Sequence, residues 1–185
     1  MAKPLRILAM LPLFFLLFTA CGQDPAGEEK FLALKDQQLS AQVQARLQSG
    51  GKESEYTLHL SFSGQDAHIT VAEPAAHAGI AVTVGKEGSF LRYGQTELVI
   101  PGGEEKLSLF SLLWSSAAGL TGGRYDAAGA EDENFTVYCS AKLGDAGLTH
   151  RYVLDGETGL PLISETAGEG VSLYLRWESC EISEG

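Results

Sequence analysis

Hydrophobic and polar residues alternate at every second position along most of this chain. This period is typical of β-strands that bury one face and expose the other. The first clear run places Leu39, Ala41, Val43, Ala45 and Leu47 on one face, between polar residues. Similar runs follow at residues 56–62, 67–71, 80–84, 135–139, 148–154, 160–165 and 171–177. Because short turns separate most of them, the pattern predicts an antiparallel meander.

Two tight turns predict the register of the strands beside them. If Gly64-Gln65 is a two-residue loop, Leu58 lies opposite Val71 and Leu60 lies opposite Ile69. All four side chains then share one face of the sheet.

The second hairpin follows the same rule. A loop at Gly94-Gln95 places Leu91 opposite Leu98 and Phe90 opposite Val99. Hairpin pattern and turn chemistry therefore agree at two separate places in the chain.

Residues 104–120 have the one clear helical pattern. Glu104 and Glu105 suit the positive amino end of a helix, and the glycines from Gly119 onward end it. Apolar residues occur nearly all round this segment, so we expect the sheet to enclose it. Phe110 and Trp114, four residues apart, should pack together against the sheet. The main apolar stripe predicted for the helix consists of Leu107, Phe110, Trp114, Ala117 and Ala118.

The first twenty residues have the features of a secretory signal. Lys3 and Arg6 are followed by an apolar stretch at 7–18, which is shorter than the ~18 residues of a membrane-spanning helix. Cys21 comes directly after Thr19-Ala20, an arrangement that resembles the bacterial lipobox. The resemblance implies a diacylglycerol on the Cys21 thiol, acylation of the new amino terminus, and an extracytoplasmic protein anchored to a bacterial cell membrane. The alternative is an ordinary signal with a chance cysteine.

The remaining chain is long enough for one domain. We divide it into an anchor and tether at 21–35 and a domain at 36–185, because residues 22–30 are small, polar and without apolar period. Loss of Lys3 and Arg6 with the signal leaves 11 basic and 24 acidic residues, a formal net charge of −13. This charge disfavours binding to nucleic acid.

The most specific motif lies in a hairpin reading Tyr-Val-Leu-Asp-Gly-Glu-Thr-Gly-Leu-Pro-Leu at residues 152–162. Together with the lipobox, the strand pattern and the apolar helix, it resembles the LolA/LolB/RseB-like group of lipoprotein carriers. The resemblance implies an α+β fold, mainly antiparallel β: an open half barrel of about ten strands with an enclosed apolar helix. The group usually opens with a longer amphipathic helix than residues 28–37 can form, so the lid over the concave face is expected to be incomplete.

Two functions follow from this resemblance. In one, the protein is an anchored scaffold that binds an envelope protein or enzyme through a strand edge or loops. In the other, the concave face binds a hydrophobic ligand, either a lipid or an acylated peptide. The helix distinguishes them, because a helix that fills the concavity leaves little room for an acyl chain. The residues expected to line the concavity are Val43, Leu58, Leu60, Ile69, Val71, Leu98, Phe110, Trp114, Leu173 and Leu175.

Catalytic and metal-binding patterns are weak in this sequence. The chain has no P-loop, G-x-S-x-G, H-E-x-x-H or C-x-x-C motif. His59 and His68 share the polar face of one hairpin, but no acidic or cysteine residue supports them, so we expect no metal or other cofactor. The acidic clusters at 104–105 and 131–133 fit a helix start and a solvated loop. We therefore expect a protein that is not an enzyme.

Two cysteines remain after Cys21. Cys139 continues the alternation of Phe135 and Val137, so it should face inward. Cys180 is out of step with the apolar residues before it and needs a bulge near Glu178 or Ser179 to face inward. An oxidising compartment allows a disulfide between them, but in a meander their strands would not be neighbours. Free thiols and an intermolecular bond remain the alternatives.

Overall fold

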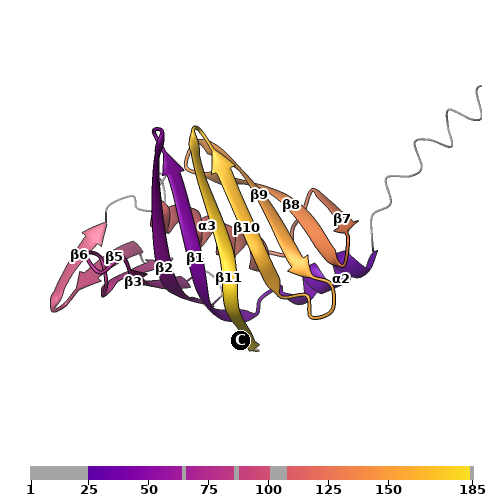
Figure 1. The fold of residues 1–185 in the computed structure, drawn as a ribbon, viewed down its shortest axis with the longest axis horizontal. Coiled ribbons are helices and arrows are strands. Elements are labelled where there is room, and N and C mark those ends of the chain that lie inside the picture. The colour runs from indigo at the N-terminus through magenta and orange to yellow at the C-terminus, as the bar shows by residue number, and fades with distance from the viewer. Residues whose placement is uncertain (1–24, 64–65, 86–87, 101–107, 184–185) are drawn as a thin grey trace, which may run out of the picture.

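One eleven-stranded antiparallel sheet and two helices make up the part of the chain that the computed structural model describes, residues 25–63, 66–85, 88–100 and 108–183 (Figure 1). The helices are α2 (Pro25–Ala33) and α3 (Leu109–Thr121). The strands before α3 are β1 (Gln38–Ser49), β2 (Lys52–Ser63), β3 (Asp66–Glu73), β4 (Ile80–Gly85), β5 (Gly88–Tyr93) and β6 (Thr96–Ile100). Those after it are β7 (Ala127–Glu131), β8 (Asn134–Leu143), β9 (Ala146–Asp155), β10 (Pro161–Gly168) and β11 (Val171–Ser183). The sheet is open, as the half barrel requires.

The sheet consists of two meanders joined by the first and last strands. Its order is β6-β5-β4-β3-β2-β1-β11-β10-β9-β8-β7, with β1 paired to β11. The predicted antiparallel meander is confirmed within each half of the sheet, whereas the pairing of β1 with β11 was not predicted. β6 and β7 are the two outer strands, and α3 lies between them in the sequence. The chain thus passes from one edge of the sheet to the other through α3, which places this helix across the sheet.

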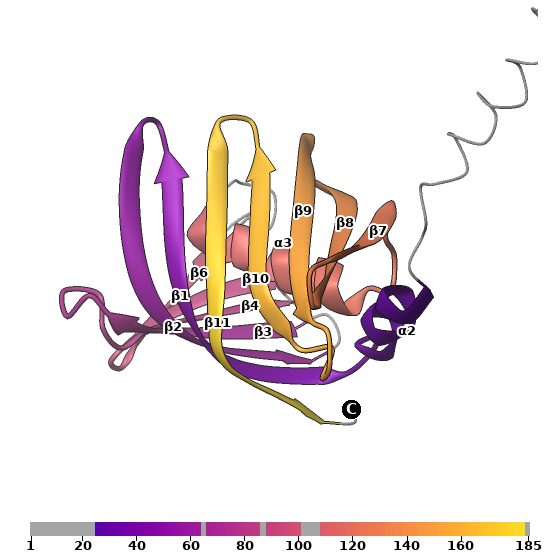
Figure 2. The ribbon, with the colours of Figure 1, turned by 45° about the vertical axis from the view of Figure 1, so that its right-hand side comes forward.

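The curvature of the sheet encloses α3 (Figure 2). Strands β1, β11, β10 and β9 stand on one side of the helix, and β3 and β4 pass beneath it. Both meanders contribute to a single core around the helix. The largest fully buried side chains are Phe31, Leu58, Phe62, Ile69, Leu112, Leu113, Leu120, Leu148, Tyr152, Leu154, Leu173 and Leu175.

The register of both predicted hairpins is confirmed. Leu58 pairs with Val71 and Leu60 with Ile69, and all four are buried. The loop residues 64–65 themselves lie outside the described residues.

At the β5–β6 hairpin, Phe90 pairs with Val99 and Leu91 with Leu98 around the predicted loop. In both hairpins the two-residue connection selects one register. In the first hairpin this register keeps the apolar side chains on one face, whereas in the second the pairs Phe90–Val99 and Leu91–Leu98 lie on opposite faces.

β7 is the strand that the sequence pattern missed. Its residues, Ala127 to Glu131, are alanine, glycine and glutamate, and none of them is β-branched or aromatic. Such residues have low strand propensity. β7 forms because it pairs with β8 over its whole length, from Ala127 opposite Tyr138 to Glu131 opposite Asn134.

The amino-terminal segment corrects the predicted tether. Residues from Pro25 onward form α2, and Phe31 and Leu34 are buried in the core. Lys30 fixes the helix to the β9–β10 turn, since its Nζ donates to the carbonyl oxygens of Gly156 and, at 2.8 Å, of Glu157. The folded part therefore starts before residue 36, the expected domain boundary. At nine residues, α2 is also as short as the sequence led us to expect for an opening helix.

Candidate functional site

The concave face of the sheet holds most of the residues expected to line a binding concavity. Seven of the ten are buried in the central core, namely Val43, Leu58, Leu60, Ile69, Val71, Leu173 and Leu175. Phe110 and Trp114 on α3 are partly buried and pack against the same core.

Leu98 is the exception, because its side chain is 57% exposed. It lies on the outer strand β6, whereas α3 packs mainly against β3, β4 and the strands β8 to β11. The alternation of the hairpin predicted the face of Leu98 correctly relative to its partner Leu91, but it could not show whether the core reaches that far. Leu98 therefore shares the face of Val82 and Ile69 but lies outside the buried core.

α3 fills the concavity. Leu109, Leu112, Leu113 and Leu120 are at most 8% exposed, whereas the predicted stripe through Phe110 and Trp114 lies on the less buried side of the helix. The space between α3 and the β2–β3 hairpin, lined by residues such as Leu60, Ile69, Leu113 and Ala117, is only about 10 Å³. Pockets for small molecules usually measure ~300–1,000 Å³. The space between α3 and the β2–β3 hairpin is therefore too small for an acyl chain while α3 is in place.

Ser108 begins the helix with a capping box. Its hydroxyl accepts from the Ser111 N–H at 3.2 Å, and the Ser111 hydroxyl accepts from the Ser108 N–H at 2.9 Å. The acidic residues Glu104 and Glu105 predict an earlier start, and both lie outside the described residues. A Ser-x-x-Ser spacing is a weaker signal than Ser-x-x-Glu, which explains why the cap was missed.

A buried polar network joins α3 to the sheet through His150 on β9. Its Nε2 lies 3.3 Å from the Ser115 hydroxyl of α3, and its Nδ1 lies 2.8 Å from the Thr166 hydroxyl of β10. The ring is 1% exposed, and burial lowers the pKa of His150 to about 4. His150 is therefore neutral at pH 7. The sequence carried a signal for this burial, because His150 has the same parity as the buried residues Leu148 and Leu154.

The geometry of this network indicates a structural role and not a catalytic one. Although a serine and a histidine are close together, Ser115 is 5% exposed and His150 is 1% exposed, so a substrate cannot reach them. The third group is the hydroxyl of Thr166 rather than a carboxylate that would stabilise a protonated imidazole. Ser115 and His150 therefore hold α3 against the sheet.

Tyr152 makes the second polar contact between the helix and the sheet. Its side chain is fully buried and stacks on His150 with ring centroids 5.9 Å apart. The Tyr152 hydroxyl donates to the Ser116 carbonyl oxygen at 2.7 Å, and burial raises the pKa of this phenol well above its usual value. Gly119 lets α3 approach this closely, because a Cβ atom there would lie 2.3 Å from the Tyr152 hydroxyl oxygen.

Gly119→Ala is expected to destabilise the protein, although alanine favours helices by ~1 kcal/mol over glycine. The added methyl group would overlap the Tyr152 hydroxyl, and overpacking of this kind costs ~1–3 kcal/mol. Gly147→Ala is the matched control, because a Cβ atom at Gly147 meets nothing within 4 Å. Thermal unfolding followed by circular dichroism should show a lower melting temperature for Gly119→Ala alone. An equal or higher value would contradict the close packing of α3 on Tyr152.

The two cysteines are separate. Cys139 lies on β8 and Cys180 on β11, with β9 and β10 between their strands, and both are free. An intramolecular disulfide is therefore excluded in this fold. The predicted bulge is confirmed, since Ser179 pairs with Gln42 and Trp177 with Val43, leaving Glu178 as the extra residue. Burial raises the pKa of the Cys139 thiol to about 12 and that of Cys180 to about 11, so both are poor nucleophiles at pH 7.

The exposed histidines form no metal site in the described part of the chain. His59 lies opposite Thr70 and Ser61 opposite His68, which confirms that the two histidines share a polar face. The Nδ1 of His68 lies 3.0 Å from the Thr83 hydroxyl. Within the described ranges, no three His, Cys, Asp or Glu side chains come together as metal ligands.

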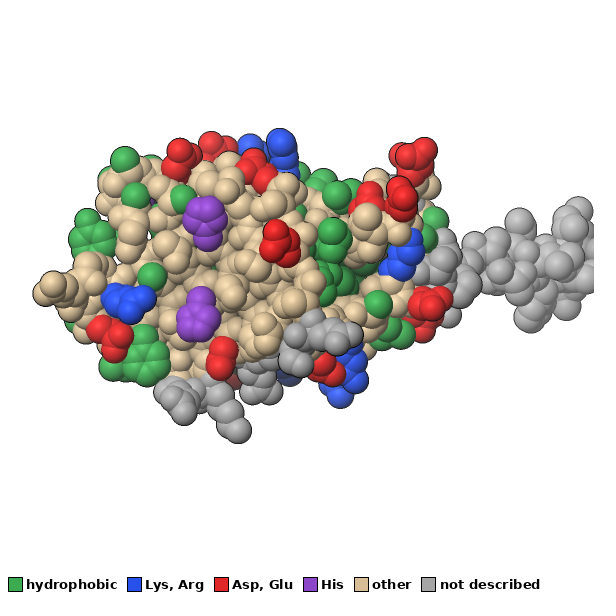
Figure 3. Space-filling model, turned by 90° about the horizontal axis from the view of Figure 1, so that it is seen from below, with side chains coloured by type: hydrophobic (Ala, Val, Ile, Leu, Met, Phe, Trp, Pro, Cys, Tyr) green, Lys and Arg blue, Asp and Glu red, His purple; other side chains and the backbone are tan. Residues whose placement is uncertain are grey.

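The surface carries no extended basic region on the side shown in Figure 3. There, Lys and Arg side chains are scattered among more numerous acidic ones, and the middle is largely uncharged. On this face the distribution agrees with the net negative charge of the sequence.

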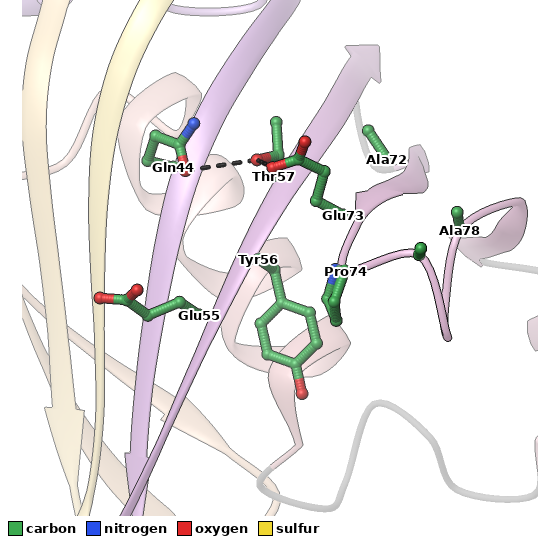
Figure 4. A pocket seen from close by; sticks show the side chains of 9 residues that line it. Gln44, Glu55, Tyr56, Thr57, Ala72, Glu73, Pro74 and Ala78 are labelled. Carbon is green, nitrogen blue, oxygen red and sulfur yellow. Dashed lines mark hydrogen bonds between the residues drawn. The ribbon is translucent and has the colours of Figure 1, made fainter.

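Two adjoining hollows lie on the outer face of the sheet. The larger, about 390 Å³, is formed by the ends of β2 and β3 and the turn after β3 (Figure 4). In it, the Thr57 hydroxyl lies 3.0 Å from a Glu73 carboxylate oxygen and 3.3 Å from the Gln44 side-chain oxygen. The second, about 330 Å³, shares Gln44 and Glu55 with the first and adds Arg46 and Arg176. No sequence pattern indicates these hollows, because they depend on where β3 leaves the sheet.

Comparison with known proteins agrees with the half barrel. An outer membrane lipoprotein-sorting domain from Vibrio parahaemolyticus superposes with a TM-score of 0.50 at 9% identity, covering 85% of this chain and 91% of that chain. The chain has the LolA-like fold. A LolA superfamily protein from Nitrosomonas europaea is similar over 86% of this chain and 93% of its own, with 11% identity and a TM-score of 0.49.

A third structure is the DUF1329 family protein of Desulfovibrio piger. It has 12% identity, covers 88% of this chain and 94% of its own, and has a TM-score of 0.49. No family model and no curated protein matches the chain. At these identities the similarity defines the LolA-like fold, and the chemistry must come from this chain's own residues.

Proposed function

We propose that this LolA-like protein is a lipid-anchored, extracytoplasmic scaffold that binds a partner protein of the bacterial envelope and has no catalytic activity of its own. The observation that carries the proposal is the occupied concavity. α3 is buried along its sheet-facing side, leaves about 10 Å³ beside the β2–β3 hairpin, and is held by His150 and Tyr152. A carrier of this fold needs that space for its ligand.

The position of α2 supports a domain held close to the membrane. Three residues separate Cys21 from Pro25, and four residue steps span at most ~14 Å. None of the described helices is long and apolar enough to cross a bilayer. We infer that attachment depends on the lipid at Cys21, and that the end of the half barrel carrying α2 and the β9–β10 turn faces the membrane.

Cys21→Ala should leave the precursor unlipidated and uncleaved at this position. Diacylglycerol transfer needs the thiol, and the lipoprotein peptidase acts on the modified cysteine. Metabolic labelling with a fatty acid, followed by detergent partitioning, measures the effect: the variant should lose the label and the cleavage at this position. Cys180→Ala is the control, because its thiol is partly buried in the folded domain. Equal labelling of wild type and Cys21→Ala would contradict the anchor.

Native mass spectrometry of the purified protein tests the scaffold against the carrier. The scaffold predicts a mass equal to that of the chain with its anchor, and no uptake of an apolar probe dye. The alternative function, binding of a lipid or acylated peptide in the concave face, requires α3 to move out of the core. A copurified lipid, or uptake of the dye that increases when Gly119→Ala loosens α3, would establish that alternative and refute the scaffold.

A further inference from the structure

One end of β2 is paired on one side only. β2 pairs with β1 from Lys52 to Phe62, whereas its pairing with β3 starts at Thr57. The β1–β2 hairpin has a two-residue loop, Gly50-Gly51, so hydrogen-bonded pairs alternate with non-bonded pairs from Ser49–Lys52 onward. This alternation turns the backbone N–H and C=O groups of Glu53 and Glu55 away from β1. Among the described strands, none pairs with this edge.

The chain leaves this edge open because β3 ends early. Pro74 follows Glu73 and has no N–H to continue the pairing. The turn that follows is closed by hydrogen bonds of its own: the His77 N–H donates to the Pro74 carbonyl at 2.8 Å, and the Gly79 N–H donates to the Val71 carbonyl at 2.9 Å. These bonds direct the chain toward β4 and away from the end of β2.

The larger outer hollow lies beside this open edge. Its walls are Glu55, Tyr56 and Thr57 of β2 on one side and residues from Ala72 to Ala78 on the other (Figure 4). An extended segment that continued the line of β3 past Glu73 would occupy this space. At about 390 Å³, the hollow is within the ~300–1,000 Å³ range of ligand sites.

The charge of the hollow favours a basic occupant. Its lining contains two carboxylates, Glu55 and Glu73, and no Lys or Arg. Arg46 contacts Glu55 at 3.2 Å and also Glu53 at 3.7 Å, so one cation is shared between two acids. The Glu73 carboxylate receives the Thr57 hydroxyl, a neutral donor, at 3.0 Å. The hollow therefore keeps a negative charge.

An aromatic surface adds to this preference. Tyr56 lines the hollow and is stacked on His77, with ring centroids 6.1 Å apart and an angle of 26° between the planes. The face of a tyrosine ring attracts a lysine or arginine side chain. The Tyr56 ring thus provides an aromatic surface at the margin of the hollow, while the Glu55 carboxylate lies on the other face of β2 (Figure 4).

We propose that the partner adds an extended segment to the Lys52–Tyr56 edge of β2, and that a lysine or arginine of this segment enters the hollow between Glu55 and Glu73. The proposal rests on the scaffold function and specifies how the partner binds. In strand addition, main-chain hydrogen bonds supply affinity and pockets for alternate side chains supply specificity. Glu53 and Glu55 provide the main-chain groups, and Glu73 provides the specificity.

Peptide titration tests this site. The probe is a nine-residue acetylated and amidated peptide of alternating valine and threonine with a central lysine, measured by fluorescence anisotropy against the full chain. Two control peptides carry a central glutamate in place of lysine, or N-methyl groups on alternate amides. The lysine peptide should bind about fivefold more tightly than the glutamate peptide. The N-methylated peptide should not bind, because it cannot donate to the strand edge.

Protein variants locate the site. Glu73→Gln should weaken binding of the lysine peptide about three- to fivefold. Glu181→Gln, which changes the net charge equally at the far end of β11, should leave binding within about twofold. Backbone NMR shifts on adding peptide should centre on the amides of Glu53 and Glu55.

Equal binding of the lysine and glutamate peptides, unchanged binding of the N-methylated peptide, shifts confined to another strand, or no binding at all would each overturn the proposal. None of these outcomes would place a lipid in the barrel. Native mass spectrometry therefore reports on the scaffold function independently of this site.

Discussion

Leu112→Ala should lower the free energy of unfolding by about 3–5 kcal/mol, out of a typical ~5–15 kcal/mol for a domain. Leu112 is fully buried on the side of α3 that faces the sheet, and its loss leaves a cavity at the centre of the core. Urea unfolding of the unlipidated Cys21→Ala protein, followed by circular dichroism, measures the change.

Two variants serve as controls for Leu112→Ala. Leu32→Ala removes the same atoms from α2 at a side chain that is 39% exposed, and should change stability by less than ~1 kcal/mol. Trp114→Ala should fall between the two, because Trp114 packs against the core but is only partly buried. If Leu112→Ala keeps wild-type stability and instead gains uptake of an apolar dye, α3 is a movable lid, and the scaffold proposal fails.

The sequence predicted the structure best where interactions are local. Each hairpin register follows from a two-residue turn and an alternating pattern within about twenty residues, and the pairs Leu60–Ile69 and Phe90–Val99 are confirmed. The apolar composition of the helix likewise predicted its enclosure. Local patterns determine which face a side chain takes.

The sequence pattern could not predict which strands pair when they lie far apart in the chain. β1 pairs with β11, which brings Leu39 opposite Ile182, and no turn or motif connects those two residues. Because this pair joins the meanders, β6 and β7 become the outer strands and α3 must cross the sheet. The exposure of Leu98 has the same origin: how far its strand lies from the main core depends on the order of the whole sheet.

The α2 segment shows another limit. Residues 22–30 are polar and have no apolar period, so the sequence favoured a flexible tether. α2 is held instead by contacts from distant parts of the chain: Phe31 packs edge-on against Tyr125 at 6.1 Å, and Lys30 lies over the Phe135 ring at 5.5 Å. Tertiary contacts thus outweighed a weak helical preference.

The position of α3 inside the half barrel supports the proposal that the partner binds on the outer face. With α3 held inside by leucines and by His150, the apolar side chains of the concave face are used for stability. The groups that remain for a partner are exposed backbone and polar side chains at the sheet's margins. The edge at Glu53 and Glu55 is such a margin, since it has unpaired backbone groups and an adjoining hollow.

Acid should destabilise the protein through His150. The folded-state pKa of about 4 lies below the value of ~6.5 in an unfolded chain, because burial disfavours the imidazolium. Above pH ~6.5 both states hold a neutral ring and stability is at its full value. Between pH 6.5 and 4 the unfolded state takes up the proton first, so the free energy of unfolding falls, by about 3 kcal/mol in total.

His150→Gln isolates this effect, because glutamine keeps polar atoms near Ser115 and Thr166 and does not titrate. The variant should be less stable at pH 7.5 but should lose less stability than wild type between pH 6.5 and 4, as measured by urea unfolding at pH 7.5, 5.5 and 4.5. Other groups also lose stabilisation in acid: the Thr158 hydroxyl and amide lower the pKa of Asp155, for example. Such contributions are the same in both proteins, so they cancel when the dependence of the free energy of unfolding on pH is compared between wild type and variant. Parallel slopes for the two proteins would mean that His150 is accessible to protons in the folded state, and the tight packing of α3 against β9 would have to be given up.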